Sequence, residues 1–317
     1  MDISVIIPAF NERESLPELS AWIARVMQEN GYSYEVLIVD DGSTDGSWET
    51  IRELAGADTH VHGLRFLRNY GKSAALYCGF ERVQGDVVFT MDADLQDSPD
   101  ELPEMYRMIT EQGYDLVSGW KQHRKDNALT KNLPSKLYNA TARRITGIKL
   151  HDMNCGLKAY RKEVVKHIEV YGEMHRYIPY LAKNAGFTKI GEKPVVHAKR
   201  KYGKSKFGMN CFIHGFLDLL SIWFLQKFGK KPMHLFGGIG TLTFLIGAVI
   251  AIWLIIDKLV AQAHGAYFRP VADQPLFYLA LVAIILGAQL FLTGFLGELI
   301  ARNATERNQY NIKKTIR

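Results

Sequence analysis

Hydrophobic and polar positions follow one repeating order along the amino-terminal part of the chain: short apolar run, polar loop, amphipathic segment. The apolar runs lie at residues 3–7, 36–39, 64–67 and 87–91, and their length and β-branched content are typical of buried strands. The segments between them carry apolar residues three and four positions apart, as in residues 16–26, which indicates helices. This recurrence predicts a parallel sheet covered by helices on both faces.

The fourth apolar run stops at two carboxylates, Asp92 and Asp94. Open α/β sheets bind ligands at the carboxyl ends of their strands. Carboxylate oxygens there suit Mg²⁺ or Mn²⁺, which fill their remaining positions with water and substrate phosphates, and Gln96 offers a third oxygen ligand. An acidic turn that caps a helix beginning near Pro99 would explain the same short pattern. The neighbouring loops have to decide between the two.

Polar residues also follow the other predicted strands, namely Asn11, Glu12, Asp40, Asp41 and Lys72. Each alone would fit turn or capping chemistry, but in a parallel sheet they converge on one crevice. Acidic groups there suit ribose hydroxyls, a base N–H and a metal, and a lysine suits phosphate. The chain contains neither the G-x-G-x-x-G nor the G-x-x-x-x-G-K-[ST] pattern, so a dinucleotide fold and a P-loop are excluded. A sugar nucleotide with a divalent metal fits the pattern.

Residues 5–12, 39–46 and 92–96 resemble the three signature segments of family 2 glycosyltransferases with the GT-A fold. The resemblance covers residues 1–208 and is strongest to the dolichyl-phosphate mannose synthase and bacterial polyprenyl-phosphate glycosyltransferase branch. It implies a Rossmann-like α/β domain with a mostly parallel sheet, and an inverting transfer from a nucleotide-activated sugar.

The resemblance also assigns roles to individual residues. It implies that Asp92, Asp94 and Gln96 hold the metal, Mg²⁺ or Mn²⁺, and the diphosphate. It places Pro8, Phe10, Glu12 and Asp40 around the nucleoside, and we add to this nucleotide and sugar site Asn11, Asp41, Lys72, Asp92 and Ala93. The segment from Arg200 resembles the R-x-x-G-x-S-K motif that covers the diphosphate, through Arg200, Ser205 and Lys206. Without the resemblance, these basic residues would fit a patch that contacts the membrane surface equally well.

Asp152 matches the position of a catalytic aspartate in related glycosyltransferases, and we group it with Asp94 and Arg200 as catalytic. A sugar hydroxyl needs a general base when it attacks. A phosphate monoester, whose second pKa is about 6, is already nucleophilic near pH 7. Asp152 is therefore expected to orient the acceptor or organise the sugar as much as to remove a proton, and a turn aspartate remains the alternative.

Basic residues follow the predicted strand at residues 115–119. Such charges usually mark a solvated face. Relatives place the acceptor's lipid phosphate near this region, so Lys121 and Arg124 are predicted to contact it.

The last third of the chain has the pattern of segments that lie on or in a membrane. Residues 209–231 combine apolar residues at helical spacing with basic flanks, which predicts an interfacial amphipathic helix. Residues 233–256 and 275–299 are predicted membrane spans, because each contains a charge-free apolar stretch longer than the roughly 20 residues needed. Residues 257–274 then form an extracytoplasmic loop and residues 300–317 a cytoplasmic tail. The basic residues outside the pair place both termini in the cytoplasm by the positive-inside rule.

Composition adds modest limits. A net charge of +6, without a basic stripe interleaved with aromatics, gives no support for nucleic-acid binding. Three cysteines without metal-type spacing indicate buried thiols in a reducing compartment. No signal peptide precedes the first strand, so the amino-terminal domain is expected in the cytoplasm, at the inner membrane of a cell.

These features together predict the transfer of one sugar from a nucleotide donor, UDP-linked as in UDP-glucose, to a polyprenyl phosphate such as undecaprenyl phosphate. A processive polysaccharide synthase is the enzyme alternative, although the chain lacks its Q-x-x-R-W motif and further spans. A non-catalytic, nucleotide-binding scaffold for a lipid-sugar flippase is the alternative from another class. We also expect a homo-oligomer, with Gly237, Gly240, Gly287 and Gly294 allowing close helix packing.

Overall fold

The computed structural model describes residues 1–122, 140–144, 146–198, 201–202, 224, 232–265, 269–303 and 312–316. Contacts divide the chain into two compact units, Met1–Leu219 with Arg307–Arg317, and Leu220–Glu306. Outside the described residues lie all of the predicted interfacial helix 209–231 except residue 224, and the predicted site residues Arg124, Arg200, Ser205 and Lys206.

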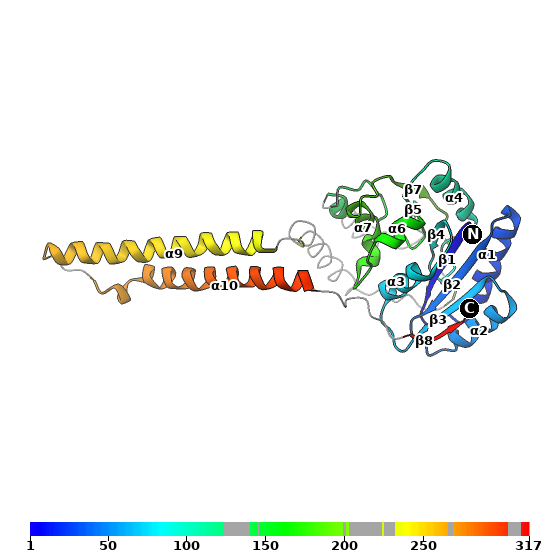
Figure 1. Cartoon of the computed structure of the whole chain (residues 1–317), viewed down its shortest axis with the longest axis horizontal. Helices are drawn as coiled ribbons and strands as arrows, with labels where there is room; N and C mark the ends of the chain where they lie inside the picture. The colour runs from blue at the N-terminus through cyan, green and yellow to red at the C-terminus, as the bar shows by residue number, and fades with distance from the viewer. Residues whose placement is uncertain are drawn as a thin grey trace. The chain divides into compact units, whose positions relative to one another are not determined.

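The first unit is built on one sheet with the strand order β7-β5-β6-β4-β1-β2-β3-β8 (Figure 1). Its strands are β1 (Ile3–Ala9), β2 (Tyr34–Asp40), β3 (Val61–Phe66), β4 (Val87–Thr90), β5 (Leu116–Trp120), β6 (Lys158–Arg161), β7 (Ile190–Pro194) and β8 (Ile312–Ile316). β1 pairs in parallel with β2 and β4, β2 with β3, and β5 with β7, whereas β6 and β8 run antiparallel to their neighbours. The mostly parallel α/β sheet is therefore confirmed.

Helices cover both faces of this sheet. They are α1 (Leu16–Asn30), α2 (Ser47–Ala57), α3 (Lys72–Arg82), η1 (Pro99–Glu101), α4 (Leu102–Thr110), α6 (Lys162–His167), η3 (Met174–Tyr177) and α7 (Ile178–Asn184). One buried apolar cluster joins the sheet to α1, α2 and α4, and a second joins it to α3, α6 and α7. Neighbouring β1 residues divide between them, with Val5 in the first cluster and Ile6 in the second. This alternation is what a strand buried on both sides requires.

Three strands, β6, β7 and β8, were not predicted, and β7 pairs in parallel with β5. β6 enters antiparallel between β4 and β5, with Lys158 opposite Thr90. β8 comes from the end of the chain and pairs with β3, with Lys314 opposite Arg65. Ile316 packs against the first apolar cluster. The last residues of the predicted tail thus belong to the sheet of the first unit.

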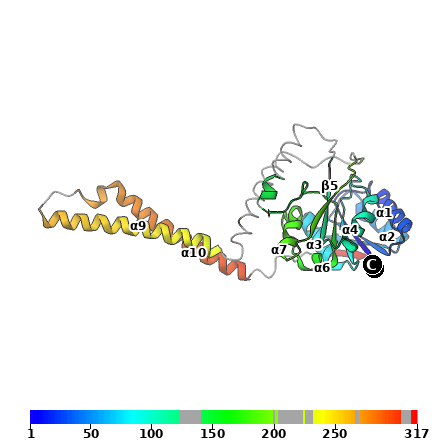
Figure 2. The same cartoon turned by 90° about the horizontal axis from the view of Figure 1, so that it is seen from above.

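The second unit is a helical hairpin of α9 (Pro232–Ala263), η4 (Val271–Asp273) and α10 (Pro275–Asn303) (Figure 2). Residues 233–263 and 275–297 are long and apolar enough to cross a membrane. α9 thus continues beyond residue 256, where the sequence predicts the span to end.

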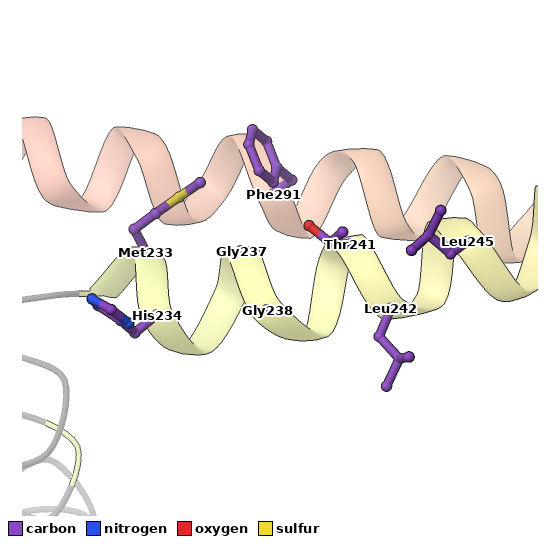
Figure 3. Close-up of a pocket in the computed structure, with 8 residues that line it drawn as sticks. All are labelled: Met233, His234, Gly237, Gly238, Thr241, Leu242, Leu245 and Phe291. Carbon is purple, nitrogen blue, oxygen red and sulfur yellow. The ribbon is translucent and has the colours of Figure 1, made fainter.

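Glycines allow the two helices to approach closely. A Cβ atom at Gly240 would lie 2.6 Å from the Gly287 carbonyl oxygen, and one at Gly287 would lie 2.5 Å from the Phe244 nitrogen. A Cβ at Gly294 would lie 2.9 Å from the Cβ of Phe236. The small residues therefore serve packing within the hairpin. Near the start of α9, Met233, Gly237, Gly238 and Thr241 line a shallow pocket that Phe291 of α10 borders (Figure 3).

Candidate active site

The loops after β1 and β2 are tied to each other by hydrogen bonds. The Asn11 N–H donates to Ser43 Oγ over 2.9 Å, and Asn11 Oδ1 accepts from the Thr44 N–H over 2.9 Å. The Glu12 N–H donates to Ser47 Oγ over 2.9 Å. The Asn11 side-chain oxygen therefore already holds the neighbouring loop, and it does so from a left-handed backbone conformation with φ 57°.

Asp40 and Asp41 are buried at the end of β2. One oxygen of Asp40 accepts from the Ser43 N–H over 2.9 Å, and the other lies 3.3 Å from Arg65 Nε. Asp41 accepts the N–H groups of Tyr70 and Gly71 over 2.7 and 2.9 Å. Both carboxylates thus fix the loops that surround the predicted nucleoside pocket. Pro8, near the end of β1, and Phe10, directly after it, are half-buried, and Ala9 between them pairs with Asp40.

Asp92 follows β4, and its carboxylate forms an ion pair with Lys72, the first residue of α3. Gly156 packs so closely against this carboxylate that a side chain there would collide with it. Burial opposes the charge of Asp92, but the ammonium groups of Lys72 and Lys121 outweigh burial and hold its pKa well below the ordinary value. Asp92 is therefore an anion at neutral pH, in contact with a cation.

Asp94 and Gln96 lie on the turn that follows. Asp94 is buried, and its Oδ1 accepts from the Gln96 N–H over 3.2 Å. Leu95 between them has a φ of 58°, a conformation that costs a bulky residue energy and marks a constrained turn. The Gln96 side chain donates to the Ala198 carbonyl over 3.3 Å and lies 3.4 Å from His197 Nε2. Ala93 is buried in the apolar cluster beneath.

The donor set fits a hard divalent cation. Asp92, Asp94 and Gln96 supply carboxylate and amide oxygens, the ligand type that Mg²⁺ and Mn²⁺ prefer. Within the described ranges, no group of three or more His, Cys, Asp or Glu residues could hold a metal. A cation here would therefore rely on substrate phosphates and water to complete its coordination, as Mg²⁺ commonly does. These ligands remain a prediction.

Lys121 lies deeper than a solvated surface charge. Its Nζ is 2.9 Å from Asp97 Oδ1, and the Asp97 side chain is fully buried. Burial disfavours the Lys121 charge, but Asp97 outweighs burial and raises the Lys121 pKa. His197 Nδ1 lies 3.5 Å from the same oxygen. The Lys121 ammonium group therefore already has a carboxylate partner in the protein. Its contact with an acceptor phosphate stays a prediction.

Asp152 is buried in the loop before β6. Its Oδ1 accepts from the Asn154 N–H over 3.2 Å, which is the bond expected of a turn aspartate. Asp152 also acts electrostatically on Cys155 and Lys158, so it belongs to the same cluster as Asp92. Burial raises the pKa of Cys155 to about 12, and this thiol is therefore not a nucleophile at neutral pH.

Three residues of this region were not identified from the sequence: Lys158, His175 and His197. Lys158 and His175 line a small pocket beside Lys72 and Gly156, and His197 adjoins Gln96. Burial, followed by the charge of Lys72, lowers the His175 pKa well below 6.5, so its ring is neutral at neutral pH. A lysine within the apolar stretch of residues 157–160 was the available signal for Lys158.

Residues 4–169 match the family model described as glycosyl transferase family 2. The chain belongs to this family and is a glycosyltransferase. It is 34% identical to the dodecaprenyl-phosphate galacturonate synthase of Rhizobium johnstonii, covering 95% of this chain and 88% of the relative. It is 37% identical to the undecaprenyl-phosphate 4-deoxy-4-formamido-L-arabinose transferase of Shewanella sediminis, covering 95% of this chain and 87% of the relative.

Solved structures confirm the GT-A fold. Glucosyl-3-phosphoglycerate synthase from Mycobacterium tuberculosis, in complex with Mn²⁺, UDP-glucose and phosphoglyceric acid, superposes with a TM-score of 0.54 at 22% identity. The superposition covers 70% of this chain and 79% of that one. The same enzyme with Mg²⁺ and UDP gives a TM-score of 0.52 at 21% identity, over 69% of this chain and 79% of that one.

Proposed function

We propose that this glycosyltransferase moves one sugar from a UDP-linked donor to the phosphate of a polyprenyl carrier at the cytoplasmic face of a membrane. The observation that carries the proposal is the Asp92–Lys72 ion pair at the end of β4, beside Asp94, in a chain that also holds two helices suited to span a membrane. The two relatives named above act on dodecaprenyl and undecaprenyl phosphate, which supports a lipid phosphate as acceptor.

The donor would lie across the carboxyl ends of the strands. Asp40 and Asp41 hold the loops around the nucleoside, and Asp92 and Asp94 lie where the diphosphate would follow. A divalent cation held by Asp92, Asp94 and Gln96 would neutralise the charge that builds on the departing diphosphate. The structures of M. tuberculosis glucosyl-3-phosphoglycerate synthase with Mn²⁺ or Mg²⁺ support this choice of cation.

The acceptor needs little activation. A phosphate monoester is mostly a dianion near pH 7, because its second pKa is about 6. One of its oxygens forms the new bond to the anomeric carbon while the bond to the diphosphate breaks, which inverts the configuration. Asp152 would then orient the reacting groups, and Lys72 would balance the negative charge that two phosphorylated substrates bring together.

Transfer of radiolabel tests the proposal. Purified full-length protein is incubated with undecaprenyl phosphate, Mg²⁺ or Mn²⁺, and a panel of labelled UDP- and GDP-sugars. We expect label in an organic-extractable, mild-acid-labile lipid from one UDP-sugar, and a loss of at least about 100-fold in Asp94→Ala, the scale seen when a transition-state electrostatic contact is removed. Asp86→Ala, at an exposed aspartate before β4, is the matched control and should keep its activity.

Two results would contradict the proposal. Nucleotide binding without any labelled lipid would rule out the lipid phosphate as acceptor. Label that enters a polymer in place of a lipid would favour a polysaccharide synthase.

A further inference from the structure

A small pocket lies beside the Asp92–Lys72 pair, on the side away from the predicted nucleoside loops. Its polar lining consists of Lys72, Thr90, Asn154, Lys158, Tyr160 and His175. These residues come from α3, β4, β6, η3 and the loop before β6. We call it the Lys158 pocket.

Lys158 is the feature that calls for a ligand. The residue is buried, with only 3% of its surface exposed. Its ammonium group donates to the Cys155 carbonyl oxygen, and within the described residues no carboxylate forms an ion pair with it. Burial lowers the pKa of Lys158, and the charges of Asp152 and Asp92, which act through space, offset this only in part. A buried ammonium with a single carbonyl partner is costly and is stabilised when an anion enters beside it.

The order of strands indicates which part of a donor reaches this pocket. The nucleoside candidates follow β1 and β2, the Asp92–Asp94 pair follows β4, and Lys158 begins β6 on the far side of β4. A nucleotide sugar laid across this edge has its nucleoside over β1 and β2 and its diphosphate at β4. The sugar is then the part that extends toward β6.

From this placement we propose that the Lys158 pocket binds a carboxylate on the donor sugar, so that the donor is a nucleotide-linked uronic acid. The inference rests on the proposed function, and it replaces a neutral hexose by an acidic one.

Two other lining groups, Lys72 and His175, suit an anion as well. Lys72 brings a second ammonium group, and its charge is shared with Asp92. Ser73 Oγ accepts the backbone N–H of His175 over 3.1 Å, so its own hydrogen is available to His175 Nδ1 at 3.0 Å. The neutral His175 ring then keeps its proton on Nε2 as a donor. The Thr90 hydroxyl donates to the Gly156 carbonyl oxygen over 3.0 Å and lies 3.2 Å from the Tyr160 hydroxyl, so its hydrogen is held within the protein.

Binding measured without the acceptor lipid tests the inference separately from the proposed function. UDP-galacturonate, UDP-glucose and UDP are titrated by calorimetry into the full-length protein with Mg²⁺. We expect the wild type to bind UDP-galacturonate more tightly than UDP-glucose. Lys158→Met should weaken UDP-galacturonate about 10- to 100-fold, the scale of a hydrogen bond to a charged group, and change UDP by less than about twofold. Lys149→Met, at an exposed lysine, should change none of the three.

A second variant covers the case in which Lys158→Met does not fold. Asn154→Asp adds a carboxylate to the pocket, and it should weaken UDP-galacturonate selectively by repulsion. An equal loss for UDP and UDP-galacturonate in Lys158→Met would assign the lysine to the diphosphate and overturn the inference. So would a wild-type preference for UDP-glucose. Absence of lipid transfer would instead refute the acceptor and leave these binding results standing.

Discussion

The acidic residues near the predicted donor site form hydrogen bonds within the protein. Asp40 and Asp45 accept backbone N–H groups a few residues further along the chain, and Asp41 accepts one from the loop after β3. Loops that carry a binding site gain their shape from such bonds, because their backbone has no sheet or helix partners. An acidic motif can therefore be necessary for binding without contacting the ligand.

Asp45 allows this to be tested away from the chemistry. Its Oδ1 accepts the Ser47 N–H over 3.0 Å and the Ser47 hydroxyl over 2.6 Å at the start of α2, and its Oδ2 accepts the Arg13 N–H over 3.2 Å. Asp45→Ala should lower the free energy of unfolding by about 1 kcal/mol at pH 7, the usual net contribution of a hydrogen bond to stability. Urea unfolding followed by tryptophan fluorescence measures it.

The pH dependence has a defined sign. Partial burial opposes the Asp45 charge, but hydrogen bonds from Ser47 and Arg13 outweigh it and lower the Asp45 pKa below 3.8. The stabilisation is therefore complete above pH 3.8 and is lost as pH falls through the lower, folded-state value. The difference in free energy of unfolding between wild type and Asp45→Ala should therefore become smaller as the pH falls below 3.8. Asp45→Asn keeps an accepting oxygen without the charge. The difference in free energy of unfolding between Asp45→Asn and Asp45→Ala should therefore not vary with pH. An Asp45→Ala deficit equal at pH 7 and pH 3 would contradict this account.

Residues with strong local patterns were predictable, and those defined by distant contacts were not. An apolar run that ends at Asp92 and Asp94 indicates the strand end directly. His175 acquires its position from Ser73 in α3, about a hundred residues earlier in the chain, and no local pattern encodes that contact. Lys158 reads as one polar residue in a short strand, and only the fold shows that it is buried.

The same limit holds for whole elements. The parallel strands β1 to β4 are apolar and are each followed by a helical pattern, so their class and order could be predicted. β8 contains Lys313 and Lys314, and its partner β3 lies at the other end of the chain. Charged residues on an edge strand are common because they discourage pairing with other chains. They also remove the apolar signal by which a strand is recognised.

The α9–α10 hairpin offers a prediction with a matched control. A Cβ at Gly287 would lie 2.5 Å from the Phe244 backbone nitrogen, whereas one at Gly238 would meet nothing within 4 Å. Gly287→Ala should therefore force the helices apart and destabilise the hairpin by about 1–3 kcal/mol, the usual cost of overpacking. Gly238→Ala adds the same methyl group where space exists and should be neutral.

Two measurements on the full-length protein in detergent distinguish these variants. The first is thermal unfolding. The second is the rate of disulfide formation between one cysteine introduced in α9 and one introduced in α10. A lower melting temperature and slower cross-linking are expected for Gly287→Ala alone. Equal behaviour of the two variants would show that the helices do not pack at Gly287.

At the scale of the whole molecule, β8 constrains how the chain meets a membrane. β8 follows both apolar helices in the sequence, yet it pairs with β3 in the sheet of the first unit. A strand can join that sheet only on the side of the membrane where the sheet lies. Any membrane crossings of the chain between β7 and β8 must therefore be even in number, and α9 and α10 are two helices long and apolar enough to make them.

Accessibility of single cysteines tests this topology. Single cysteines replace Glu29 in α1, Asp273 in η4 and Lys314 in β8, one in each variant. Cys211 is changed to serine in all of them to remove a competing thiol. Cys78 and Cys155 are buried and can stay. With a membrane-impermeant maleimide on intact spheroplasts, only Asp273→Cys should be labelled, and the other two should react after permeabilisation. That result would place the sheet in the cytoplasm, as the basic residues outside the predicted spans lead us to expect. Labelling of Lys314→Cys together with Asp273→Cys would separate β8 from the sheet and leave an odd number of crossings. Labelling of Glu29→Cys and Lys314→Cys without Asp273→Cys would keep the hairpin but reverse its orientation.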